Sequence, residues 1–268
     1  MKRHLLFLAA LLIVNLAASA QKKFSVYAVG FYNQENLFDT CHDEGKKDYE
    51  YLPNKGWNGM KYTNKLRNMS KALADMGTDV LPNVGCAFIG LSEVENHKVL
   101  DALVDQAPLK ARNMKYVHIE GPDRRGIDCA LLYNPSLFSV KNVKLLPYVQ
   151  ELAKDSAFFT RGFLTVRGEM AGDDVAVIVC HWPSRFSGPF YRESAARQVK
   201  VIKDSLLNVN QEMKIFVMGD MNDDPVNKSM HVYLQAKPEI SQVGAGDMYN
   251  PWYNVLARDG KGPIYYSS

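Results

Sequence analysis

Cysteine is scarce in this sequence: the 268 residues include four, and no two have the spacing of a zinc site. Cys86, Cys129 and Cys180 lie in or beside apolar, strand-like runs, where a buried free thiol is the commoner state. An even number of cysteines in an exported chain also permits disulfides, and the sequence leaves this open. The cysteines therefore predict neither a zinc protein nor a disulfide-stapled fold.

An excess of one charge is also missing. Without Lys2 and Arg3 of the leader, the formal net charge falls from +3 to +1. This balance disfavours a nucleic-acid-binding domain built on a broad basic surface, although a local basic groove stays compatible with it. Internal repeats, low-complexity tracts and linkers are lacking too, so we expect one domain, residues 21–268.

A long apolar run occurs only at the N-terminus. The basic residues Lys-Arg-His precede an apolar stretch from Leu5 to Ala18, and residues 18–20 are small. This pattern predicts a secretory signal peptide, residues 1–20, and a secreted or periplasmic protein. The stretch is shorter than the roughly 20 residues of a membrane span, with an uncleaved anchor as the alternative. We expect a monomer without a stable membrane span.

Apolar, strand-like runs alternate with amphipathic segments along the rest of the chain. Amphipathic helices are predicted from Lys61, around Val99 and from Ala195, and residues 40–58 are expected to form a surface loop. The predicted strands are Phe24–Tyr32, Cys86–Leu91, Tyr116–Ile119, Ile127–Tyr133, Phe138–Tyr148, Gly162–Met170, Val175–Cys180 and Ile215–Met218. This order predicts an α/β protein with mixed sheets covered by helices.

Polar residues recur where these strands end: Asn33, Glu93, His181, Asp220 and Asn222. Each has a structural explanation as well, such as a turn cap, a helix-entry carboxylate or a satisfied histidine. Ligands bind at the carboxyl ends of strands in open α/β sheets, so the whole set predicts one site.

Phosphoryl chemistry suits this set. Glu93 and the carbonyl oxygen of Asn33 would be ligands for Mg²⁺, or for Mn²⁺. His181 would hydrogen-bond the phosphate or protonate the leaving oxygen. Asp220 would activate water, and Asn222 would donate to a phosphate oxygen.

Three further residues are candidates for substrate binding: Arg125, Asp128 and Arg185. The two arginines could form bidentate contacts with phosphate. Nearby aromatic residues in 184–192 could stack on bases, contact a membrane or pack on a helix, and these alternatives stay open.

Five ordered motifs carry a resemblance to a known family: FYNQENLFD, GLSEVEN, RRGIDCALLY, HWPSR and GDMNDDP. Together they resemble the endonuclease/exonuclease/phosphatase superfamily, in particular secreted bacterial members of its deoxyribonuclease-like branch. The resemblance covers about Phe24 to Pro225. It implies a four-layer α/β sandwich of two packed mixed β-sheets flanked by helices, with a metal site at one edge.

The resemblance also assigns roles residue by residue. Asn33 is similar to the family's first-strand Asn near metal and phosphate, and Glu93 to its metal-binding Glu. His181 is similar to the catalytic His, while Asp220 and Asn222 match its G-D-x-N motif. Arg125 and Asp128 lie in a motif that varies more between branches.

One family motif is missing. Members end with a Ser-Asp-His-like motif, and this sequence contains no Asp-His dipeptide. We therefore expect a C-terminally shortened domain that lacks the last strands.

These features predict a metal-dependent phosphoric ester hydrolase acting on phosphodiesters, with nucleic acid among the candidate substrates. The alternatives are a phosphomonoesterase for inositol phosphates or phospholipid headgroups, and an inactive family member.

Overall fold

The computed structural model describes residues 25–149, 151 and 159–259, with side chains described up to residue 255. The predicted signal peptide lies outside these residues. No helix of the described residues is both long and apolar enough to cross a membrane.

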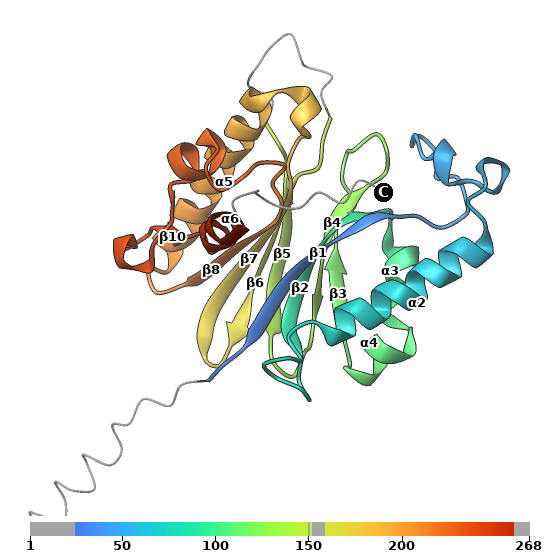
Figure 1. Cartoon of the computed structure of the whole chain (residues 1–268), viewed down its shortest axis with the longest axis horizontal. Coiled ribbons are helices and arrows are strands. Elements are labelled where there is room, and N and C mark those ends of the chain that lie inside the picture. Colours follow the sequence, from blue (N-terminus) through green and yellow to red (C-terminus); the bar gives the residue numbers. More distant parts are fainter. Residues whose placement is uncertain (1–24, 150, 152–158, 260–268) are drawn as a thin grey trace, which may run out of the picture.

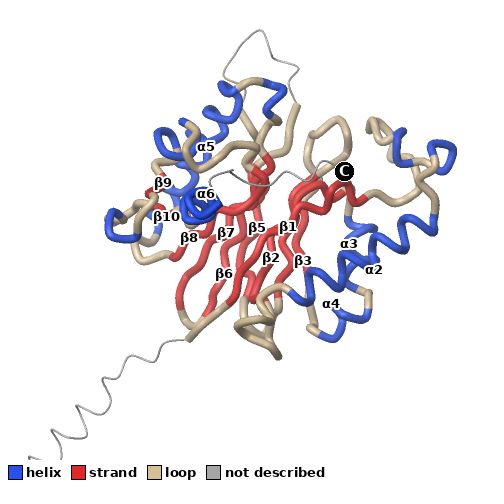
Figure 2. The backbone as a smooth tube through the Cα atoms, viewed as in Figure 1, coloured by secondary structure: helices blue, strands red, loops and turns tan. Residues whose placement is uncertain are grey.

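Two four-stranded mixed sheets form the centre of the molecule (Figures 1 and 2). The first sheet has the order β1-β2-β4-β3, in which β1 and β2 are parallel and the other pairs antiparallel. The second has the order β5-β6-β7-β8, in which only β7 and β8 are parallel. The strands are β1 (Ala28–Leu37), β2 (Cys86–Val94), β3 (Lys115–His118), β4 (Asp128–Tyr133), β5 (Ser139–Leu146), β6 (Phe163–Met170), β7 (Asp173–His181) and β8 (Lys214–Asp220).

Helices cover the outer face of each sheet (Figure 1). The first sheet packs against α2 (Gly59–Asp75), α3 (His97–Val104) and α4 (Ala107–Ala111), and the second against α5 (Pro189–Val209). The described chain ends with a short parallel pair, β9 (Ala236–Lys237) and β10 (Met248–Tyr249), and with α6 (Trp252–Asp259). The expected four-layer α/β sandwich is confirmed.

The continuous apolar sequence of β7 follows from burial on both of its faces. Val175, Val177 and Val179 point between the two sheets, where they pack with residues of β2, β4 and β6. Ile178 and Cys180 point the opposite way, toward α5. Strands alternate their side chains between faces, so a strand between two apolar layers needs apolar residues at nearly every position.

The strands that carry the predicted site extend further than the sequence indicates. The sequence predicts that these strands end at Tyr32, Leu91, Cys180 and Met218. In the structure they end at Leu37, Val94, His181 and Asp220. The polar residues continue the ladders, because backbone pairing does not depend on apolar side chains: Asn33 pairs with Ser92, and His181 with Asp220. Asn33, Glu93, His181 and Asp220 therefore lie within the ends of strands, and Asn222 follows the end of β8.

Residues 40–58 lie at the surface, as expected, and most of their side chains are exposed. They contain the short 3₁₀ turns Tyr49–Tyr51 and Pro53–Lys55, and Asp48 is buried. The Asp48 carboxylate pairs with the His42 ring and accepts a hydrogen bond of 2.8 Å from the Asp43 backbone N–H. These contacts stabilise the segment internally, and Asn96 Nδ2 connects it to the rest of the domain by donating to Asp43 Oδ2 at 2.8 Å.

All four cysteines are free thiols, and Cys41 alone among them is exposed.

Candidate active site

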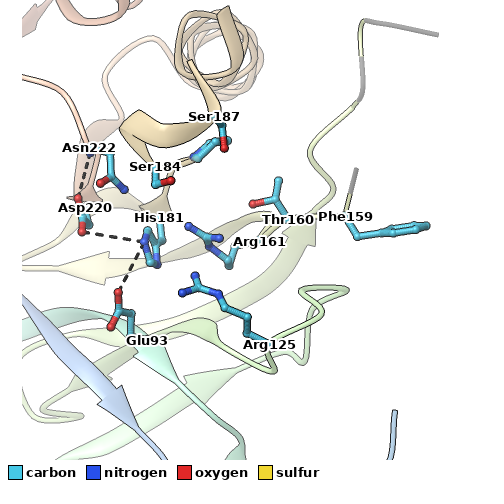
Figure 3. A pocket seen from close by; sticks show the side chains of 11 residues that line it. Glu93, Arg125, Phe159, Thr160, Arg161, His181, Ser184, Ser187, Asp220 and Asn222 are labelled. Atoms are coloured by element: carbon cyan, nitrogen blue, oxygen red, sulfur yellow. Dashed lines mark hydrogen bonds and ion pairs between the residues drawn. The ribbon is translucent and has the colours of Figure 1, made fainter. Parts of the chain in front are cut away.

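A pocket of about 290 Å³ opens beside the carboxyl ends of β2, β7 and β8 (Figure 3). This volume is at the lower end of the range for small-ligand pockets, about 300–1,000 Å³. Its lining includes four of the five predicted strand-end residues, and the complete set is Glu93, Arg125, Phe159, Thr160, Arg161, His181, Pro183, Ser184, Ser187, Asp220 and Asn222.

Glu93, His181 and Asp220 converge in this pocket. One ligand atom of each lies within 4.8 Å of the others, and His181 Nε2 is 3.9 Å from Glu93 Oε1 and 4.0 Å from Asp220 Oδ2. These separations exceed hydrogen-bond length. Glu93 adopts a positive φ of 59° beside a register shift in the β2–β4 ladder. Such irregularities re-aim side chains near functional sites. The two carboxylates supply the hard oxygen donors that a divalent cation such as Mg²⁺ requires.

Two asparagines orient Asp220. Asn33 Nδ2 donates a hydrogen bond of 3.2 Å to Asp220 Oδ2, and the Asn222 backbone N–H donates one of 3.0 Å to Oδ1. Asn222 Nδ2 also donates to the Trp182 carbonyl at 3.0 Å. The Oδ1 of Asn33 accepts from the Glu35 N–H at 2.9 Å, so Asn33 reaches the site by way of Asp220.

His181 is 5% exposed, which determines its protonation state. Burial lowers the pKa of His181 well below its ordinary value, and the positive charges of Arg161 and Arg125 lower this pKa further. The imidazole is therefore neutral at pH 7, with one donor and one acceptor nitrogen. A neutral His181 can hydrogen-bond a phosphate or accept a proton.

Arg161 lines the pocket but is not among the residues predicted from the sequence. Its Nη1 donates to Asp123 Oδ2 at 3.0 Å, and its Nη2 donates to the Trp182 carbonyl at 3.0 Å. Asp123 Oδ1 lies 3.8 Å from Nε of Arg125, so one carboxylate pairs with two guanidinium groups. The one available signal was the position of Arg161, next to the glycine that precedes the apolar strand β6.

Asp128 and Arg185 are absent from the pocket lining. Asp128 is 4% exposed, and it contacts His118 Nε2 at 3.0 Å and accepts from the Gly121 N–H at 3.0 Å. Burial raises the pKa of Asp128, although His118 opposes this effect. Arg185 donates to the Asn222 carbonyl at 3.0 Å and to Asp224 at 2.9 Å. Both residues thus contact neighbouring segments of the chain, and neither lines the pocket.

A buried ion pair ties together the loops that follow β7 and β8. Arg192 Nε is 2.7 Å from Asp223 Oδ1, with both side chains at most 6% exposed. Arg192 Nη1 also donates to the carbonyls of Ser184 and Gly188, and Ser229 donates to Asp223. The loop that contains Asp223 directly follows Asp220, so this ion pair fixes the position of the loop relative to His181.

The fold is similar to several solved structures. ANGEL2, described as a 2′,3′-cyclic phosphatase, is 14% identical, with a TM-score of 0.55 over 83% of this chain and 60% of that chain. A β-hairpin deletion mutant of beta toxin from Staphylococcus aureus is 15% identical, with a TM-score of 0.53 over 80% of this chain and 75% of that one. Humanized D. rerio TDP2 is 13% identical, with a TM-score of 0.45 over 66% of this chain and 63% of that one.

The chain thus spans less than two thirds of the ANGEL2 and TDP2 chains. At these identities the likeness concerns the fold alone. No curated protein matches the sequence significantly. The profile of the endonuclease/exonuclease/phosphatase family, in contrast, matches residues 28–268. This match covers most of the chain, which therefore belongs to the endonuclease/exonuclease/phosphatase family.

Proposed function

We propose that this protein is a metal-dependent phosphoesterase that hydrolyses phosphodiesters. The observation that carries the proposal is the convergence of Glu93, His181 and Asp220 at the strand ends of a chain of this family. Export through the predicted leader, residues 1–20, would place the activity in the periplasm or outside the cell.

Glu93 and Asp220 would hold the cation, Mg²⁺ or Mn²⁺. Their side chains are 14% and 30% exposed, so both carboxylates are accessible from the pocket. When bound, the cation would supply a Lewis acid that offsets charge on a phosphoryl oxygen.

The side chains of the pocket would perform the other steps. Asp220, oriented by Asn33 and by the Asn222 backbone, would position the attacking water and take up its proton. Neutral His181 would hydrogen-bond a phosphate oxygen, and a solvent water would protonate the leaving oxygen as the bond between that oxygen and phosphorus breaks. Asn222 has a second amide hydrogen besides the one bonded to Trp182, and that hydrogen would donate to the same phosphate. Arg125 and Arg161 would stabilise the negative charge that develops in the transition state.

A phosphomonoesterase is the second candidate function. Two guanidinium groups lie beside the pocket, and a terminal phosphate carries more negative charge than a diester. Inositol phosphates and phospholipid headgroups are the candidate substrates of this type.

Hydrolysis of two chromogenic esters would separate these functions. Residues 21–268 would be assayed with bis(p-nitrophenyl) phosphate and p-nitrophenyl phosphate, with Mg²⁺, with Mn²⁺ and with chelator. We expect metal-dependent turnover of the diester at the higher kcat/KM. A higher value for the monoester would favour the second function. A folded sample that turns over neither ester would identify an inactive family member.

A further inference from the structure

We propose that Lys65 is a positioning residue of the active site: it fixes a bulge of β1 that aims Asn33 at Asp220. This inference rests on the proposed function and adds a residue that aligns its carboxylates. Lys65 belongs to α2 and is not among the residues that line the pocket, so it acts through the backbone of β1.

The last part of β1 is longer than the part of β2 beside it. Asn33 pairs with Ser92 and Leu37 pairs with Val94, so residues 34–36 of β1 face the single residue Glu93 of β2. We call residues 34–36 the β1 bulge. Bulges bend a strand and re-aim side chains next to active sites. The proposed cation ligand Glu93 therefore lies directly opposite the irregular part of β1.

Two residues of the β1 bulge have an uncommon backbone conformation. Glu35 has a φ of 49° and Asn36 has a φ of 64°. Asparagine tolerates this left-handed region, whereas a glutamate in it is unusual. Such a conformation persists only where the surrounding contacts over-determine it. The geometry of the bulge therefore depends on the partners that hold it.

Both backbone polar groups of Glu35 have a side-chain partner. The Glu35 N–H donates to Asn33 Oδ1 at 2.9 Å, and the Glu35 carbonyl accepts from Lys65 Nζ at 2.9 Å. Asn33 Nδ2 in turn donates to Asp220 Oδ2 at 3.2 Å. A continuous chain of hydrogen bonds thus runs from α2 through the β1 bulge to the proposed general base. Lys65 is the member of this chain that belongs to the helix layer.

Lys65 also lies near the other carboxylate of the site. Burial lowers the pKa of Lys65, and the negative charges of Glu35 and Glu93 oppose this effect. Without the Lys65 ammonium group, the β1 bulge can relax, and Asn33 then loses the N–H that orients its carboxamide toward Asp220. A displacement of about 1 Å in an active site can lower the rate by roughly 10²-fold.

The activity test compares Lys65→Met, Lys65→Arg and the control Lys71→Met, which removes an exposed lysine of α2. The substrate is bis(p-nitrophenyl) phosphate with saturating Mg²⁺ or Mn²⁺. We expect Lys65→Met to lower kcat by about tenfold or more and to leave KM within about threefold, because no substrate contact is removed. Lys65→Arg, which still offers a donor, should restore most of kcat. An unchanged kcat in Lys65→Met, a change confined to KM, or an equal loss in the control would overturn the proposal.

A double-variant cycle tests whether Lys65 acts through Asn33. In the Asn33→Ala background the chain to Asp220 is already interrupted, so adding Lys65→Met should lower kcat by less than about twofold. Losses that multiply in full would show that Lys65 does not act by this route.

Hydrogen exchange separates failure of this inference from failure of the proposed function. The exchange rate of the Glu35 backbone amide would be measured by NMR in wild type, Lys65→Met and Lys71→Met. If wild type hydrolyses no phosphoester, the phosphoesterase proposal fails, and this measurement still decides about Lys65. Exchange that is about tenfold faster in Lys65→Met alone supports the role, because the bond from this amide to Asn33 opens more often. Equal rates in the three proteins contradict it.

Discussion

Asn33 and Asp220 are 187 positions apart in the sequence, yet a hydrogen bond of 3.2 Å joins their side chains. Asn33 belongs to β1 and Asp220 to β8, which are edge strands of different sheets. The bond thus links the two sheets beside the pocket. It also fixes one oxygen of the carboxylate that we assign to water activation, so the packing of the sheets and the geometry of the site depend on each other.

Asp220→Asn should abolish most of the hydrolysis. The substitution keeps the size of the side chain but removes the negative charge that a cation and an attacking water require. We expect kcat to fall by about 10²–10⁴-fold, the usual contribution of a general acid or base. Stopped assays with the diester substrate would measure this, with the exposed Asp173→Asn as the matched control. Wild-type turnover by Asp220→Asn would exclude the proposed role.

Glu93→Gln should abolish metal binding. This loss can be measured without any assay of activity. At a cation concentration 100 times Kd, the wild type gains about 2.7 kcal/mol of stability. For a domain of this size, that gain raises Tm by roughly 5–10 °C. Thermal unfolding with Mg²⁺ or Mn²⁺ and with chelator would show this shift in wild type and in the exposed control Glu44→Gln. A full shift in Glu93→Gln would mean that the cation binds elsewhere.

Arg192→Met should destabilise the fold strongly, because it leaves the buried Asp223 carboxylate without its cation. Removing one partner of a buried pair costs about 3–5 kcal/mol. Arg197 on the same helix supplies the comparison: its ion pair with Glu151 is about one third exposed on both sides. Arg197→Met should therefore cost only about 0–1 kcal/mol.

Urea unfolding of both variants would measure these costs. The double variant Arg192→Met/Asp223→Leu should lose less stability than the sum of its single substitutions, because no uncompensated charge remains. Equal costs for Arg192→Met and Arg197→Met would contradict the importance of the buried pair.

We expect the stability of the fold to decrease as the pH rises, because of the buried Glu95. Burial raises the pKa of Glu95 to about 8, against a hydrogen bond from the Asp39 backbone N–H that lowers this pKa, and nearby acidic residues raise it as well. The folded protein thus holds a proton that the unfolded chain releases at an ordinary glutamate pKa, near 4.5. Between pH 4.5 and 8 this group lowers the free energy of unfolding by up to about 1.4 kcal/mol per pH unit, and above pH 8 its effect levels off.

Glu95→Gln should remove this dependence, since the amide resembles the protonated carboxyl. From pH 5 to pH 8, the free energy of unfolding of the wild type should fall relative to that of Glu95→Gln. Urea unfolding at several pH values would show it, with the exposed Glu212→Gln as control. A constant difference across this range would mean that Glu95 is ionised in the folded protein at pH 7.

Local sequence determined the elements and the chemistry of the site. The apolar run of β7 and the helical spacing of α2 show which side chains of each segment are buried. The eight main strands and the helices α2, α3 and α5 were therefore predictable, whereas α4 was not predicted. Glu93, His181, Asp220 and Asn222 were predictable for the same reason: each lies within a few residues of the end of an apolar run, and parallel pairing of strands brings such ends to one edge.

Only the tertiary structure decided which polar residues share the pocket. Hydrogen bonds to Asp123 and to the Trp182 carbonyl hold the Arg161 side chain in the pocket. These partners are 38 and 21 positions away in the sequence, and no local pattern encodes such contacts. Asp128 and Arg185 have the residue types of a phosphate site, but they contact partners from other segments and do not line the pocket. The strand ends were misplaced because ladder pairing depends on the neighbouring strand. The sequence of a segment thus determines which of its side chains are buried, whereas the packing of the two sheets determines which polar side chains come into contact.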